Sequence, residues 1–139
     1  MSLFSSKSRY KNVDTRLHFR ERIPVLQKRD DPFRRWFESD DMDLIVWYSE
    51  SDMVIGFQIC YHLEGEHALT WKEKVGFTHD RIEGGDHGHF NRSPILIANG
   101  PFPKDFVLAT FEKRAQTLEN ELVLFIKERL LQFGAAHVI

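Results

Sequence analysis

Residues 77–90, FTHDRIEGGDHGHF, bring together the side-chain types that could do chemistry in this chain. Imidazole nitrogens and carboxylate oxygens ligate divalent metals, and the spacing His-x-His directs two rings to one side of an extended chain. A histidine beside an acid can also act as a general acid–base pair. The residues of this stretch that could carry such chemistry are His79, Asp80, Asp86, His87 and His89.

Three interpretations of this stretch are open. In the first, these five residues hold a divalent metal. In the second, His79 and Asp80 act as general acid and base, while Arg81 or Arg92 binds an anionic substrate. In the third, which we favour, the histidines are polar residues of a solvated surface loop. No H-E-x-x-H motif, cysteine pair, EF-hand loop, nucleophile elbow or phosphate-binding loop is present, so no cofactor other than a divalent metal is indicated.

A site in this stretch would depend on the elements that hold it. His79 is the first candidate, because it follows the strand-like VGFT and a sheet holds a side chain rigidly. We expect any chemistry where the loop meets the end of a hairpin that carries His62 and His67.

That hairpin lies within residues 43–72, which contain three strand-like runs separated by two compact turns. Leu63, Glu64 and Gly65 match a three-residue loop in which a type I turn is followed by a glycine with positive φ. This loop pairs His62 with Glu66, Tyr61 with His67, Ile59 with Leu69 and Phe57 with Trp71. Alternation then predicts one core face, made of Met53, Ile55, Phe57, Ile59, Tyr61, Leu69 and Trp71.

The opposite face of the hairpin is small and polar. A solvated face is the favoured interpretation. The alternative is the floor of a ligand cleft, because Gly56 and Ala68 leave space above the backbone. In the cleft interpretation, the candidate ligand-binding residues are Gln58, Thr70, His62, His67 and Arg92.

Other runs predict further elements. Residues 16–23 alternate loosely and predict an edge strand, and residues 74–79 and 93–100 predict two more strands. Residues 30–39, with Asp31 as cap and Pro32 at the first position, predict a short helix. Residues 44–49 are apolar on both sides, which indicates a central or covered strand. Its inward residues are either Leu44, Val46 and Tyr48, or Ile45 and Trp47.

Residues 103–133 have a helical period and predict two C-terminal helices, with a break between Gln116 and Glu121 and a stop at Gly134. An uninterrupted helix that dimerises through its apolar stripe is the alternative. Strands followed by helices predict an α+β fold: a mostly antiparallel sheet of four or more strands, with the two C-terminal helices packed on one face. The stripe is Val107, Phe111, Ala115, Leu118, Leu122, Phe125, Ile126 and Phe133.

The totals limit the class of protein. A chain of 139 residues predicts a single domain, 1–139, with residues 1–12 frayed. No apolar run approaches the roughly 20 residues that span a bilayer, and the start has no apolar signal-peptide region. The single Cys60 cannot form an internal disulfide, which favours a cytoplasmic location.

The net charge of −2 is unevenly distributed, because residues 1–36 hold ten lysines and arginines against four acids. Basic residues mixed with aromatics can bind nucleic acid, but a basic segment can equally pack on the acidic remainder of the chain or on a partner. We favour packing, since no nucleic-acid-binding motif is present. The segment contains Arg9, Tyr10, Lys11, Arg16, Arg20, Arg22, Lys28, Arg29, Arg34, Arg35 and Trp36.

Residues 34–85 carry the sequences RRWF, DLIVWY, GFQICY, HALTW and GFTHDRI. On these sequences the chain resembles an uncharacterised family of small bacterial proteins. The resemblance implies a compact cytoplasmic domain and carries no activity or cofactor. The function we expect is a small binding or protein-interaction module, with a homodimer through a sheet edge or the helical stripe. The alternatives are a metal-dependent or acid–base enzyme that uses loop 77–90, and nucleic-acid binding through the basic segment.

Overall fold

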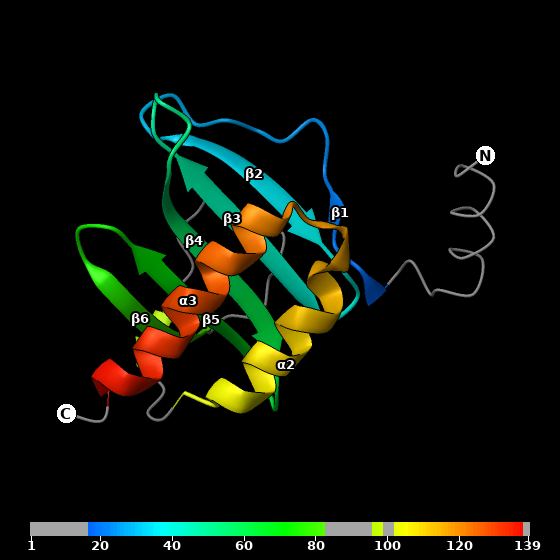
Figure 1. The fold of residues 1–139 in the computed structure, drawn as a ribbon, viewed down its shortest axis with the longest axis vertical. Coiled ribbons are helices and arrows are strands. Elements are labelled where there is room, and N and C mark those ends of the chain that lie inside the picture. The colour runs from blue at the N-terminus through cyan, green and yellow to red at the C-terminus, as the bar shows by residue number, and fades with distance from the viewer. Residues whose placement is uncertain (1–16, 83–95, 99–101, 138–139) are drawn as a thin grey trace.

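The computed structural model describes residues 17–82, 96–98 and 102–137, with side chains for 17–82 and 102–133. These residues form a seven-stranded sheet followed by two helices, which confirms the predicted α+β fold (Figure 1). Each strand pairs antiparallel with the next along the chain, in the order β1-β2-β3-β4-β5-β6-β7. The elements are β1 (Arg20–Glu21), β2 (Phe33–Glu38), β3 (Met42–Tyr48), β4 (Val54–His62), β5 (Glu66–Lys72), β6 (Gly76–Ile82), β7 (Leu96–Ala98), α2 (Lys104–Arg114), the 3-10 turn η3 (Ala115–Thr117) and α3 (Asn120–His137).

Both helices cover the same face of the sheet, which we call the helix face (Figure 1). The hydrophobic core lies between the two helices and this face of the sheet. It includes Phe57, Ile59 and Leu69 from the sheet and Val107 and Ile126 from the helices, all fully buried. The opposite side of the sheet, which lies away from the viewer in Figure 1, is called the outer face.

The hairpin formed by β4 and β5 has the predicted register, from His62 opposite Glu66 to Phe57 opposite Trp71. Its three-residue loop differs in one detail, because Glu64 has a positive φ as well as Gly65, so the turn is not of type I. The predicted core face fails at Met53, which is 64% exposed, and at Ile55. The register between β3 and β4 shifts next to Tyr48, which pairs with Val54, so Ile55 is the extra residue of a bulge. Val54 therefore takes the place on the core that Met53 and Ile55 were predicted to share.

The two open interpretations of β3 are now resolved. Leu44 and Val46 are fully buried on the helix face, with Tyr48 packed against the same core. Ile45 and Trp47 face the other way. The strand lies between β2 and β4, as its apolar sides indicated. The alternative in which Ile45 and Trp47 point inward is therefore wrong, since Trp47 lines the outer face.

Residues 33–38 form a strand, and the helix predicted for residues 30–39 is wrong. The apolar residues Phe33, Trp36 and Phe37 satisfy a helical spacing, but β2 pairs along its whole length with β3. Each of its faces mixes aromatic and charged side chains, so no period of two is visible in the sequence. Backbone pairing with a buried neighbour has overridden the local helix signals.

The C-terminal helices break as predicted, with η3 and an extended Leu118 between α2 and α3. The stop at Gly134 is wrong, because α3 continues to His137. The apolar stripe is buried against the sheet, with Leu130 as a further fully buried member. The stripe is therefore used within the chain, which removes the continuous helix that dimerises through it. No helix in the described part of the chain is long and apolar enough to cross a membrane.

The junction between the helices is tied to the first strands. The backbone N–H of Phe19 donates to the backbone carbonyl of Arg114 (2.9 Å), and the Thr117 hydroxyl donates to the backbone carbonyl of Phe19 (2.6 Å). Arg114 forms two hydrogen bonds with Asp41, both 2.8 Å long. The arginine bonds hold the pKa of Asp41 below its ordinary value of 3.8. Backbone and charge thus hold the helix break at one point on the sheet.

Replacing Phe57 with Ala should cost roughly 3–5 kcal/mol, because a fully buried aromatic ring leaves a cavity when it is truncated. Urea unfolding measures this cost, and Met53→Ala is the control, since Met53 is mostly exposed. A loss below about 1 kcal/mol for Phe57→Ala would place this residue outside the core.

The free energy of unfolding should fall in acid, in part through Asp41. A carboxyl whose pKa is lowered by folding contributes stability above its ordinary pKa, and this stability is lost as the pH falls through the lower folded value. Arg114→Gln should therefore flatten the pH dependence below about pH 5, whereas Lys113→Gln, which removes the same charge one residue away, should follow the wild type. Urea unfolding across this pH range is the measurement. Parallel curves for all three proteins would contradict the role of the pair.

Candidate functional site

The hairpin end and β6 bring three rings together on the helix face. The ring centroids of His67 and His79 lie 5.9 Å apart, and Tyr61 stacks on both. The Tyr61 hydroxyl lies 2.5 Å from Nε2 of His79, while Nε2 of His67 lies 2.8 Å from the carbonyl of Leu63. A carbonyl only accepts, so His67 carries its proton on Nε2. The predicted meeting of the loop strand with the hairpin end is present, in the form of a buried ring stack.

This ring stack belongs to the core. Phe102 packs edge-on against His79, and Phe106 lies against Tyr61. Burial raises the pKa of Tyr61, which keeps its hydroxyl protonated as a donor. His62, the other histidine predicted at this place, is exposed on the outer face.

The strand β6 separates the predicted acid–base residues. His79 lies opposite Leu69 and Asp80 opposite Ala68, and consecutive residues of a strand point to opposite faces. This geometry gives no support to His79 and Asp80 as a pair. Arg81 is exposed at the end of the strand.

The remaining loop candidates cannot be placed. Asp86, His87, His89 and Arg92 lie outside the described residues. Within the described ranges, no group of three or more histidine, cysteine or acidic residues could hold a metal ion.

The outer face is not the solvated surface that the sequence favoured. Cys60, Ala68 and Thr70 are only 5%, 1% and 8% exposed, and Ile45 is buried beside them. The expectation that Thr70 is exposed is therefore wrong, and Gln58 is half-buried. Nε2 of Gln58 donates to the Thr70 hydroxyl at 2.9 Å. The structure thus agrees with the alternative, a cleft floored by small and polar residues.

A first hollow in the outer face, which we call the acidic hollow, has a volume of about 570 Å³. Carboxylates from three places in the chain outnumber the arginines in its walls. It is lined by Arg22, Pro24, Val25, Leu26, Arg34, Trp36, Asp40, Asp41, Met42, Asp43, Cys60, Tyr61, His62 and Glu66.

Asp43 stands out in the acidic hollow. Its carboxylate accepts a hydrogen bond from Nε1 of Trp36 at 3.1 Å. Burial raises the pKa of Asp43, and the nearby charges of Glu38 and Glu66 raise it further. None of the described lysines, arginines or histidines forms an ion pair with Asp43. Placing the Asp43 carboxylate here therefore reduces the free energy of unfolding. Titratable groups in such unfavourable surroundings are common at functional sites.

A second hollow, the central hollow, has a volume of about 410 Å³ and lies over the middle strands. Its floor includes the Gln58–Thr70 pair and Ala68, and Trp47 forms one wall. Trp47 lies directly over Gly56, where an added Cβ would meet the Trp71 carbonyl oxygen at 3.1 Å and the Trp47 ring at 3.4 Å. The lining consists of Lys28, Asp31, Arg34, Ile45, Trp47, Gln58, Ala68, Thr70, Lys72, Val75, Gly76, Thr78 and Ile82.

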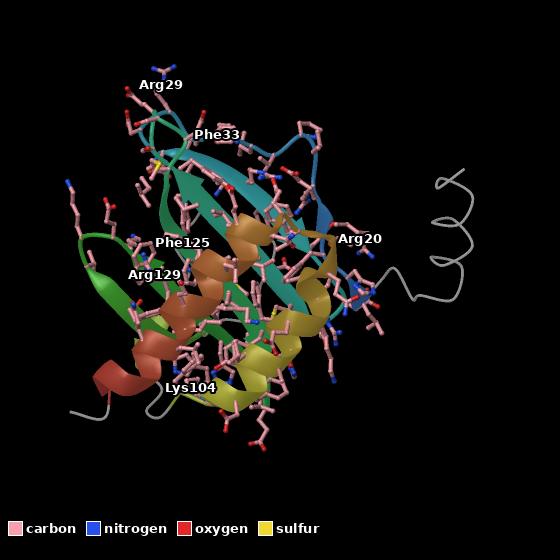
Figure 2. All side chains as sticks on the ribbon, viewed as in Figure 1. Arg20, Arg29, Phe33, Lys104, Phe125 and Arg129 are labelled. Carbon is pink, nitrogen blue, oxygen red and sulfur yellow. The ribbon has the colours of Figure 1, made fainter. Side chains whose placement is uncertain are left out.

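A third hollow of about 520 Å³ adjoins the central hollow and shares Trp47 and Lys72 with it. It reaches the end of the sheet at which β2 begins, where Figure 2 shows Arg29 and Phe33. The outer face is thus hollowed along most of its length.

Arg34 forms the wall between the acidic and central hollows and is only 7% exposed. Its Nε donates to the carbonyl of Leu26 at 2.9 Å, and its guanidinium lies 5.8 Å from the Trp36 ring centroid. The backbone of Arg34 is held as well. The side-chain amide of Gln27 accepts from its N–H (3.0 Å) and donates to its carbonyl (2.8 Å).

The sequence interpretation named Gln58, Thr70 and His62 among the residues of this face, and missed Arg34, Trp36, Asp43 and Trp47. Arg34 and Trp36 were missed because residues 30–39 were predicted to be a helix. The signal that could have found them is the sheet itself. Once β2 is a strand, Arg34 lies opposite Trp47 and Trp36 opposite Ile45 on one face.

The described part of the basic segment is largely engaged within the chain. Arg35 bonds to Glu21 at 2.7 Å and to Glu119 at 3.0 Å, and Arg22 lies 3.9 Å from Glu38. This agrees with the favoured packing of basic residues on the acidic remainder. Arg9, Tyr10, Lys11 and Arg16 lie outside the described residues.

Comparison with protein-family models, with curated proteins and with solved structures gave no match to this chain. The resemblance of residues 34–85 to a bacterial family stays a prediction.

Replacing Asp43 with Asn should raise the free energy of unfolding at neutral pH. A carboxyl whose pKa is raised by folding loses stability as the pH rises through the folded pKa, and an amide removes that loss while its oxygen still accepts from Trp36. The gain should vanish below the ordinary value of 3.8, where Asp43 is protonated in both states. Urea unfolding at both pH values is the measurement, with the exposed Asp40→Asn as control. A destabilised Asp43→Asn protein at neutral pH would refute this reading.

Proposed function

We propose that this protein is a binding module, and that it binds its ligand in the hollows of the outer face. The observation that carries the proposal is the burial of Cys60, Ala68 and Thr70 beside open hollows of several hundred Å³. Ligand sites are typically concave, with an apolar lining and a few polar groups that set orientation. The central hollow has this composition, with Ile45, Trp47 and Ala68 around the Gln58–Thr70 pair.

The energetic cost of the half-buried Asp43 also supports binding at the outer face. A chain selected for stability alone would place an apolar or amide side chain there. A carboxyl with a raised pKa and no cationic partner among the described residues is better explained by a task in the acidic hollow. The helix face offers no comparable feature, because its side chains are packed into the core.

The setting of this module is also a proposal. A bacterial cytoplasm is supported by the single buried thiol of Cys60 and by the resemblance of residues 34–85. A homodimer would now have to use a sheet edge, because the helical stripe is buried. The enzyme and nucleic-acid alternatives stay predictions. Of the metal candidates, His79 and Asp80 lie within the described residues, on opposite faces of β6.

An NMR titration tests the location of the site. The probes are indole, benzoate, phenyl phosphate, agmatine and benzamide, each added to ¹⁵N-labelled protein at millimolar concentration. We expect at least one probe to shift the amide signals of Gln58, Cys60 and Thr70, whose side chains line the hollows. Shifts confined to α3 around the exposed Leu124 and Leu131, or no shift with any probe, would contradict the proposal.

A further inference from the structure

Arg34 is a buried cation without an anionic partner in the described residues. Its side chain is more than nine-tenths buried, yet no carboxylate within residues 17–82 and 102–133 forms an ion pair with it. Its Nε is satisfied by the Leu26 carbonyl. Its two terminal nitrogens have no hydrogen-bond acceptor among these residues.

This arrangement is unusual on physical grounds. A guanidinium stays charged in any protein environment, and burial of a charge is costly unless hydrogen bonds and an opposite charge compensate for it. Among the described residues, the half-buried arginines have such partners. Arg35 binds Glu21 and Glu119, and Arg114 binds Asp41.

The surroundings of Arg34 favour an anion on one side. The central hollow carries Lys28, Arg34 and Lys72 against a single acid, Asp31. The acidic hollow on the other side has more carboxylates than arginines and would repel an anion. The free ends of the Arg34 fork can therefore be satisfied by an anion from the central side alone.

We propose that the central hollow binds a small organic anion, whose carboxylate or phosphate group is held by the terminal nitrogens of Arg34. A planar guanidinium fork matches both groups, which it can bind through two parallel hydrogen bonds. The Gln58–Thr70 pair and Thr78 supply further polar contacts. This inference rests on the proposed function and names the class of ligand.

The shape of the hollow adds a second requirement. Trp47 and Ile45 form an apolar wall beside Arg34, and the absence of a side chain at Gly56 leaves room for the Trp47 ring. A ligand with a flat apolar part next to its anionic group fits this wall better than a bare ion does.

Isothermal titration calorimetry of the full chain tests the class of ligand. The probes are indole-3-acetate, its neutral amide indole-3-acetamide, phenyl phosphate, inorganic phosphate and the cation agmatine. We expect indole-3-acetate or phenyl phosphate to bind at least about tenfold more tightly than the neutral amide and agmatine, since a hydrogen bond to a charged group is worth more than a neutral one. The better of the two anions identifies carboxylate or phosphate, and inorganic phosphate alone should bind more weakly than phenyl phosphate.

Two variants and one control assign the effect to Arg34. Arg34→Met should weaken binding of the preferred anion by about tenfold or more, and Arg34→Lys, which keeps the charge and loses the fork, should fall between. Arg22→Met is the matched control. Arg22 stacks on the same Trp36 ring and lines the acidic hollow, but it is absent from the central hollow. The control should bind like the wild type. Amide spectra confirm that each variant is folded, and Arg34→Lys decides if Arg34→Met does not fold.

The outcomes separate this inference from the proposed function. Binding of the neutral amide or agmatine as tight as that of the anions, with shifts at Gln58 and Thr70, would overturn the anion site and leave the binding module standing. Anion binding that is unchanged in a folded Arg34 variant would overturn the role of Arg34. No binding of any probe to the outer face would overturn both.

Discussion

The arrangement of the molecule depends on the bonds that hold the helix break against the first strands. Phe19 is bonded through both its N–H and its carbonyl to the end of α2 and to η3, and Arg114 and Arg35 add charged bonds to Asp41 and Glu119. With the break fixed at one corner, α2 and α3 run antiparallel, side by side, across a single face of the sheet (Figure 1). The apolar stripe of the two helices is buried there, and the hollows lie on the other face.

The outer face carries two charged side chains, Asp43 and Arg34, in its hollows. Asp43 and Arg34, each without an ion-pair partner among the described residues, lie in two adjoining hollows that share one wall. Trp36 lies between them, bonded to the carboxylate and stacked against the guanidinium. An aromatic spacer of this kind keeps two opposite charges from neutralising each other. Such a separation of charges costs stability, and it is the feature on which the proposed binding site rests.

The sequence predicted most reliably where two independent signals agreed. The hairpin register followed from the turn at Gly65 and from alternation, and both agree with the structure. The break predicted between Gln116 and Glu121 is present as well. The strand β2 was missed because Phe33, Trp36 and Phe37 fit a helical spacing, while neither face of the strand shows a period of two. The bulge at Ile55 has no local signature, so the predicted face failed beyond it. The outer-face hollows could not be predicted, because they join residues from β2 to β6 that only the sheet brings together. The sequence also placed His79 near the hairpin end that carries His67, and the two rings do stack in the structure.

The Gln27 amide has a consequence for how the molecule behaves among its copies. A strand edge with free N–H and carbonyl groups is a template for pairing with another chain. On β2 that edge is covered by the short β1, by the bond from Arg22 to the Trp36 carbonyl, and then by a single side chain, Gln27, which imitates a neighbouring strand at Arg34. Gln27 therefore covers a strand edge that could pair with another copy, and it also holds the backbone of Arg34 in the proposed binding site. Loss of the Gln27 side chain would uncover this part of the β2 edge and remove both bonds to the backbone of Arg34.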